Sequence, residues 1–181
     1  MKRFLIFILS NCLMATSVFA QSSIYNLTVT RTDALSYPLS NANGQTLMII
    51  LLPATQTASD SAFLRRIDSI AEAHAGSLQT IAVPSYEDGY TDDTAHTLLN
   101  WYKASLDSNI IISQPLYTHK SSGTQQDSLF RWLTDVTQNS RFDDEIEGAG
   151  SFYFVNAEGI LYGEFEPGAK FSNKALGKVL P

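Results

Sequence analysis

The sequence has 181 residues, of which 44% are hydrophobic, which suits one domain with a sizeable buried core. Its 18 acidic and 12 basic residues give a formal net charge of −6, which disfavours nucleic acid as a partner because phosphate backbones are repelled. The only cysteine is Cys12, so this sequence cannot form an internal disulfide or a multi-cysteine metal site.

Residues 1–20 have the pattern of a secretory signal peptide. Lys2 and Arg3 precede the apolar run 4–9, and Ala20 is the small residue before the expected cleavage point. That run is far shorter than the roughly 20 apolar residues of a transmembrane span. We therefore expect a periplasmic or secreted protein, with a lipid anchor at Cys12 as the alternative. Cleavage would leave 161 cysteine-free residues with 10 basic and 18 acidic side chains, a net charge of −8.

The first half of the remaining chain predicts a strand–helix–strand unit. Short strands are expected at 23–29 and 35–39, followed by a turn. Residues 47–52 are apolar without alternation, as in a strand that is buried on both faces, and 78–83 repeat that pattern before Pro84. The helix between them is expected to start at Ser59 or Ser61, to end near Gly76, and to carry an apolar stripe of Phe63, Ile67, Ile70, Ala71 and His74. Such a unit places the two buried strands parallel, with a right-handed crossover.

The second half predicts three more helices, a short strand and a hairpin. Asp92 or Asp93 is expected to cap one helix, Asp127 to precede another, and Ser172 to open the last. The expected inward positions are Ala95, Leu98, Leu99, Tyr102 and Leu106 in the first, Leu129, Trp132, Leu133 and Val136 in the second, and Ala175, Leu176 and Val179 in the last. The strand is expected at 110–112, and the hairpin pairs 151–155 with 160–165. We expect one α/β domain over 21–181, with a central mixed β-sheet that the hairpin extends antiparallel and that helices flank.

Five motifs in this order resemble the glutathione peroxidase family of the thioredoxin-like fold. Residues 23–27, Ser-Ile-Tyr-Asn-Leu, are similar to the family's opening Ser-x-Tyr-Asp-Phe, and 44–49 are similar to its Gly-Lys-x-Leu-Leu-Ile. Residues 83–89, Val-Pro-Ser-Tyr-Glu-Asp-Gly, fall where the family has Phe-Pro-Cys-Asn-Gln-Phe-Gly. Residues 129–133 and 152–159 are similar to its Leu-Tyr-x-Tyr-Leu helix and its Lys-Phe-Leu-Val-Asp-x-x-Gly hairpin. The resemblance covers nearly the whole chain after residue 20 and implies a thioredoxin-like fold.

The residues that carry out the family's chemistry are replaced. The family uses a cysteine or selenocysteine nucleophile supported by glutamine, tryptophan and asparagine. By position, the nucleophile falls on Gln56 or Thr57, the glutamine on Glu87, the tryptophan on Gly148, the asparagine on Ala149, and the second cysteine on Ser85. Neither a hydroxyl nor an amide can form a sulfenic acid. The resemblance therefore implies a cofactor-free binding or interaction module of the cell envelope, with an unidentified protein or small molecule as its partner. The alternative is a redox protein of the oxidative-stress response in which another residue substitutes.

The threonine and histidine side chains predict neither a nucleophilic site nor a metal site. Thr57 could be interpreted as a hydroxyl nucleophile, but the sequence places no base beside it, and helix capping by Thr57, Ser59 or Ser61 is favoured. His74, His96 and His119 lie in three segments without metal-ligand spacing.

Two acidic clusters and one aromatic cluster remain. Glu87 and Asp88 lie near Asp92 and Asp93, and Asp143, Asp144, Glu145 and Glu147 form the second acidic cluster. In the expected fold both flank the vacated site. No metal site is predicted, but calcium bound by Glu87, Asp88, Asp143, Asp144 and Glu147 is the alternative to solvated loops. The hairpin aromatics Phe152, Tyr153, Phe154 and Tyr162 could form a binding face, although sheet core is the favoured interpretation.

Overall fold

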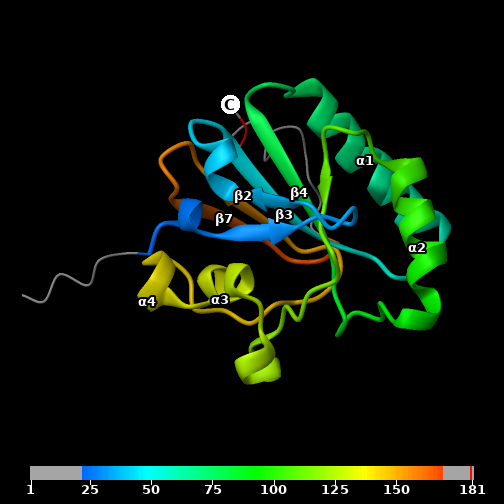
Figure 1. The fold of residues 1–181 in the computed structure, drawn as a ribbon. Coiled ribbons are helices and arrows are strands. Elements are labelled where there is room, and N and C mark those ends of the chain that lie inside the picture. Colours follow the sequence, from blue (N-terminus) through cyan, green and yellow to red (C-terminus); the bar gives the residue numbers. More distant parts are fainter. Residues whose placement is uncertain (1–21, 169–179, 181) are drawn as a thin grey trace, which may run out of the picture.

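A five-stranded mixed sheet in the order β5-β4-β3-β6-β7 lies at the centre of the computed structural model, which describes residues 22–168 and 180 (Figure 1). β3 (Thr46–Leu52) pairs in parallel with β4 (Leu78–Pro84), as does β4 with β5 (Ile111–Ile112). β6 (Phe152–Val155) runs antiparallel to β3, and β7 (Leu161–Phe165) antiparallel to β6. The expected parallel pair and the hairpin that extends its sheet are both confirmed.

Helices cover both faces of this sheet, which confirms the expected α/β class (Figure 1). α1 (Ala58–Ala73) and α2 (Asp92–Ser105) pack on one face, and α3 (Ser128–Thr134) on the other. Side chains of β3 alternate between the two cores, with Met48, Ile50 and Leu52 facing α1 and α2, and Leu47, Ile49 and Leu51 facing α3. All seven residues of β3 are buried, which explains its unbroken apolar sequence.

Both long helices begin at a capping box, and the box of α2 lies one residue before the expected caps. Thr57 caps α1 with Asp60 as its partner, and Thr91 caps α2 with Thr94. Of the three capping residues expected for α1, Thr57 is therefore confirmed and Ser59 and Ser61 are wrong, and the cap expected at Asp92 or Asp93 is wrong. A capping residue needs an extended backbone and must accept a hydrogen bond from an amide of the first turn, and the serines and aspartates already lie within the helices.

Two other expectations need correction. The strand expected at 23–29 is a 3-10 turn, η1 (Ile24–Asn26), followed by β1 (Thr28–Thr30), because the Ser23 hydroxyl accepts a hydrogen bond from the Tyr25 amide and curls the chain. β1 pairs with β2 (Ser36–Pro38) in a separate two-stranded sheet. The second error is Val136, which is 41% exposed because Asp135 ends α3 and caps a new helix, α4 (Val136–Asn139).

Shorter 3-10 helices complete the described chain: η2 (Leu39–Ala42) replaces the start of the expected turn, and η3 (Lys120–Gln125) was not expected at all. The expected signal peptide with Cys12 and the helix expected from Ser172 lie outside the described residues. Within 22–168 and 180, no helix combines the length and apolarity that a membrane crossing needs.

Candidate functional site

Three loops meet beyond the ends of β3 and β4, and they carry all the positions that the resemblance assigns to the family's catalytic residues. A Cβ atom placed on Gly89, in the loop after β4, would lie 3.4 Å from the Cβ of Ala54, in the loop after β3. A Cβ on Gly148, in the loop before β6, would lie 3.0 Å from Asp88 Oδ1. The structure therefore brings together the loops of Thr57, Glu87 and Gly148.

Thr57, one of the two residues that the resemblance assigns to the nucleophile position, is part of a helix cap. Thr57 Oγ1 accepts a hydrogen bond of 3.1 Å from the Asp60 amide, and the Thr57 amide returns one of 3.1 Å to Asp60 Oδ2. The Thr55 hydroxyl donates to the same carboxylate oxygen at 2.6 Å. Burial alone would raise the pKa of Asp60, but these hydrogen bonds outweigh it and hold the pKa below its ordinary value. The Thr57 hydroxyl thus serves as an acceptor in a capping box, while Gln56 beside it is exposed.

Glu87, at the position of the family's glutamine, is surrounded by hydrogen-bond donors. Its carboxylate accepts from the Ser85 hydroxyl at 3.1 Å, the Thr118 amide at 3.1 Å, the His119 amide at 3.4 Å, and the Ser122 hydroxyl. Burial would raise the pKa of Glu87, but the hydrogen bonds from Ser122, Thr118 and Ser85 lower it below its ordinary value. Glu87 is an ionised group that joins the loop after β4 to residues 118–122.

The second cysteine position is equally structural. Ser85 is 1% exposed, and its hydroxyl lies 2.9 Å from that of Thr118. The same oxygen accepts from the Asp88 amide at 3.3 Å. A buried hydroxyl with this many partners is fixed in position, and its own hydrogen bond to Glu87 helps to hold that carboxylate in place.

The tryptophan position holds a glycine for a steric reason. Gly148 has φ +104°, a conformation that favours glycine, and any Cβ there would press on Asp88 Oδ1. Asp88 Oδ1 also lies 3.6 Å from His119 Nε2, and both side chains are largely buried. Sequence reasoning missed this pairing, because 30 residues of chain separate the two and only the fold joins them. Ala149, at the asparagine position, is partly buried and adds no polar side chain.

Sulfur is absent from this face. Outside residues 1–20 the only sulfur in the sequence belongs to Met48. That thioether is 0% exposed, in the core beneath α1 and α2. Glutathione peroxidases attack peroxide with a thiolate or a selenolate, and a buried thioether cannot supply either.

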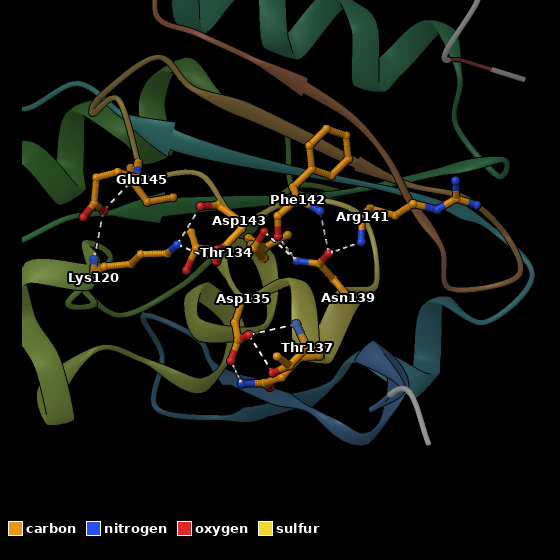
Figure 2. A network of polar contacts seen from close by, with 12 residues as sticks. Lys120, Thr134, Asp135, Thr137, Asn139, Arg141, Phe142, Asp143 and Glu145 are labelled. Carbon is orange, nitrogen blue, oxygen red and sulfur yellow. Dashed lines mark hydrogen bonds and ion pairs between the residues drawn. The ribbon is translucent and has the colours of Figure 1, made fainter. Parts of the chain in front are cut away.

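The second acidic cluster is held at its start by Asn139 and by Lys120 (Figure 2). The buried Asn139 amide group donates to the backbone oxygens of Trp132, Leu133 and Phe142. Lys120 Nζ donates to Asp143 Oδ1 at 2.9 Å, and the Lys120 amide to Glu145 Oε1 at 2.9 Å. One carboxylate of the expected cluster, Asp143, is thus already neutralised by an ion pair.

The remaining carboxylates of that cluster face β7. A pocket of about 370 Å³ is lined by Phe142, Asp144, Glu145, Glu147, Glu164 and Glu166. Burial, followed by the charges of Asp144 and Glu147, raises the pKa of Glu164. Among residues 22–168 and 180, however, no three carboxylate, histidine or cysteine side chains are grouped so that they could hold a metal ion. The calcium alternative gains no support from these positions.

The hairpin aromatics belong to the core. Phe152, Tyr153 and Phe154 are 2%, 1% and 0% exposed, and the half-buried Tyr162 packs against the same core as Phe154, so the alternative of a hairpin binding face is wrong. Another aromatic group, which sequence reasoning missed, lies on the vacated face. Tyr86 and Tyr90 flank the loop after β4, and the fold brings Tyr117 to them. The close spacing of Tyr86 and Tyr90 was the only sequence signal for this group.

Comparison with known proteins supports the fold and leaves the chemistry open. No protein-family model matches the chain, and no curated protein sequence matches it. Among solved structures, GPX1 of T. cruzi superposes with a TM-score of 0.62 at 16% identity, covering 88% of this chain and 95% of that one. A thiol:disulfide interchange protein of the thioredoxin family from Chlorobium tepidum gives 0.57 at 10% identity, covering 89% and 97%. The pneumococcal exposed lipoprotein thioredoxin Etrx1 from Streptococcus pneumoniae gives 0.50 at 19% identity, covering 84% and 95%. At these identities the likeness shows a thioredoxin-like fold.

Proposed function

We propose that this protein is a non-catalytic binding or interaction module of the cell envelope, which uses the loop face where thioredoxin-like enzymes carry their reactive group. One observation carries this proposal: Thr57, one of the two residues that the resemblance assigns to the nucleophile position, is a helix cap held reciprocally by Asp60, and the other, Gln56, is an exposed amide. A hydroxyl that accepts a hydrogen bond from a backbone amide, with an anion as its neighbour, is not activated for attack on a peroxide bond.

The supporting positions favour the same conclusion. The Glu87 carboxylate is occupied by four donors from its own chain, and a tryptophan at Gly148 would be strained at φ +104° and would place its Cβ 3.0 Å from Asp88 Oδ1. The envelope location rests on the sequence pattern of residues 1–20 and agrees with the exposed lipoprotein among the structural neighbours.

A redox role is the second candidate, favoured by the structural likeness to a GPX and to a thiol:disulfide interchange protein. It requires a redox-active group other than a cysteine thiol of residues 21–181, because none is present there. One experiment, a measurement of hydroperoxide turnover, decides between the two candidates.

The test is turnover of hydrogen peroxide and of an organic hydroperoxide, coupled to NADPH oxidation through thioredoxin or glutathione and their reductases. The protein is expressed with residues 1–20, so that the cell can export it and process the expected leader. A Cys12→Ala variant controls for the Cys12 thiol in molecules that keep those residues. We expect rates equal to those of a heat-treated sample. Turnover that survives in Cys12→Ala would establish the redox candidate and refute the binding-module proposal.

A further inference from the structure

A pocket of about 420 Å³ lies beside Glu87, between the loop after β4 and the segment that follows β5. Its lining consists of Tyr86, Glu87, Tyr90, Thr91, Asp92 and Tyr117. Three of these residues are tyrosines, two are carboxylates, and none of the six is basic. The combination of aromatic rings with negative charge is suited to a particular class of ligand.

The three rings form one continuous group with Tyr86 at its centre. The Tyr86 ring lies 4.8 Å from that of Tyr117 at 34°, and 6.2 Å from that of Tyr90 at 81°, measured between centroids. The backbone fixes this arrangement, because the Tyr86 amide donates to the Leu116 oxygen at 3.1 Å. Tyr90 is 7% exposed and anchors the group, whereas Tyr117 is 38% exposed and presents its ring to solvent. The faces of such rings attract cations through their quadrupole.

The charges around the rings favour a cation as well. Glu87 is ionised at neutral pH, since its hydrogen bonds lower its pKa, and the exposed Asp92 lies at the pocket edge. Burial, and then the charge of Asp92, raises the pKa of Tyr86, so its phenol stays neutral at that pH. A positively charged ligand would therefore meet two carboxylates and no opposing cation in the described lining.

Hydrogen-bond capacity narrows the class of cation. The Glu87 oxygens already accept from four donors, and the Thr91 hydroxyl is engaged with Thr94 in the α2 cap. A primary ammonium or a guanidinium would give up water at its N–H groups, and the acceptors of the lining that remain to replace that water are the Asp92 carboxylate and the tyrosine hydroxyls. A quaternary ammonium has no N–H groups, so it loses no such bonds when it contacts the rings.

We propose that this pocket binds a quaternary ammonium group of the choline type, carried by a small molecule or by a lipid headgroup. The inference rests on the proposed binding function, since it names the ligand class for that same face.

The test is a titration of the ¹⁵N-labelled full chain with choline, followed by the amide shifts of Tyr86, Thr91 and Tyr117. Two probes are compared with it: 3,3-dimethylbutan-1-ol, which has the same shape without the charge, and ethanolamine, which carries a primary ammonium. We expect choline to move these amides at lower concentration than either. Tyr117→Leu, which keeps apolar contact and removes the ring, should weaken choline binding about 2- to 5-fold, the effect expected of an exposed cation–π contact. Leu35→Ala, at a 61% exposed position on the β1–β2 turn, should leave it unchanged.

Vesicles separate the two sources of the ligand. Co-sedimentation with phosphatidylcholine but not with phosphatidylglycerol assigns a headgroup, and binding of free choline alone assigns a soluble ligand. Shifts elsewhere in the chain, no binding of either choline or phosphatidylcholine vesicles, or binding of the uncharged alcohol or of ethanolamine as tight as that of choline would overturn the inference. These outcomes leave the non-catalytic proposal standing, because only hydroperoxide turnover contradicts that.

Discussion

Replacing Glu87 by glutamine introduces the residue that the resemblance to glutathione peroxidases assigns to this position, yet it should destabilise this protein. The carboxylate accepts hydrogen bonds from Ser85, Thr118, His119 and Ser122. Glutamine keeps one acceptor oxygen and turns an NH₂ group toward the donors of the other, so about two of these bonds are lost. A hydrogen bond to a charged group contributes roughly 1.5–3 kcal/mol. Because Glu87 is only partly buried, the lower end applies, and we expect the free energy of unfolding to fall by about 3 kcal/mol.

In a domain of this size each kcal/mol shifts the melting temperature by about 2–4 °C, so Glu87→Gln should melt about 6–12 °C below wild type at pH 7. The lowered pKa of Glu87 determines how the stability difference between wild type and Glu87→Gln depends on pH. Its stabilisation is present above the carboxyl's unfolded pKa, about 4.3, and is lost as the pH falls through the folded pKa, so the two proteins should converge in acid. Thermal melts by circular dichroism measure both effects. Glu72→Gln, at an exposed position on α1, is the matched control. Equal melting of Glu87→Gln and Glu72→Gln at pH 7 would refute a structural role for Glu87.

Three further predictions follow from the same face and from the acidic pocket. Thr57→Ala removes the α1 cap and should cost about 1 kcal/mol in urea denaturation, whereas Thr57→Ser should cost little; equal losses would mean that the hydroxyl does not cap α1. Gly148→Ala places a Cβ at φ +104° against Asp88, so it should destabilise by about 1–3 kcal/mol in the same assay, and a neutral result would contradict the steric argument. The raised pKa of Glu164 means that its ionisation costs stability as pH rises through the interval between its unfolded and folded pKa values. Glu164→Gln should therefore raise the melting temperature at pH 7 more than at pH 4, and a reversed difference would contradict the sign.

The sequence was enough to predict the elements that a short run of neighbouring residues identifies. The apolar runs at 47–52 and 78–83 identified the two central strands and their parallel pairing, because a strand buried on both faces needs such a run. The sequence did not suffice to locate a helix cap where several neighbouring residues could form it. Thr57, Ser59 and Ser61 all carry capping hydroxyls, and only the extended backbone at Thr57 selects the cap.

The candidate site was predictable only in part, for a related reason. Order and spacing assigned Glu87 and Gly148 to the vacated face, and the structure brings their loops together. Contacts between residues far apart in the chain could not be predicted, because no pattern in the sequence indicates them. His119 lies beside Asp88, and Tyr117 against Tyr86, only because residues 114–118 run alongside the loop after β4.

The most direct test of the central claim, that this face has no peroxide-reducing group, is a stoichiometric reaction without any reductant. An excess of the Cys12→Ala protein is mixed with cumene hydroperoxide, and the remaining hydroperoxide is followed together with the intact protein mass. Because the only sulfur beyond residue 20 is the buried Met48, we predict no faster hydroperoxide loss than in buffer, and an unchanged mass. Consumption of one equivalent, with a mass change that thiol or borohydride reverses, would contradict it.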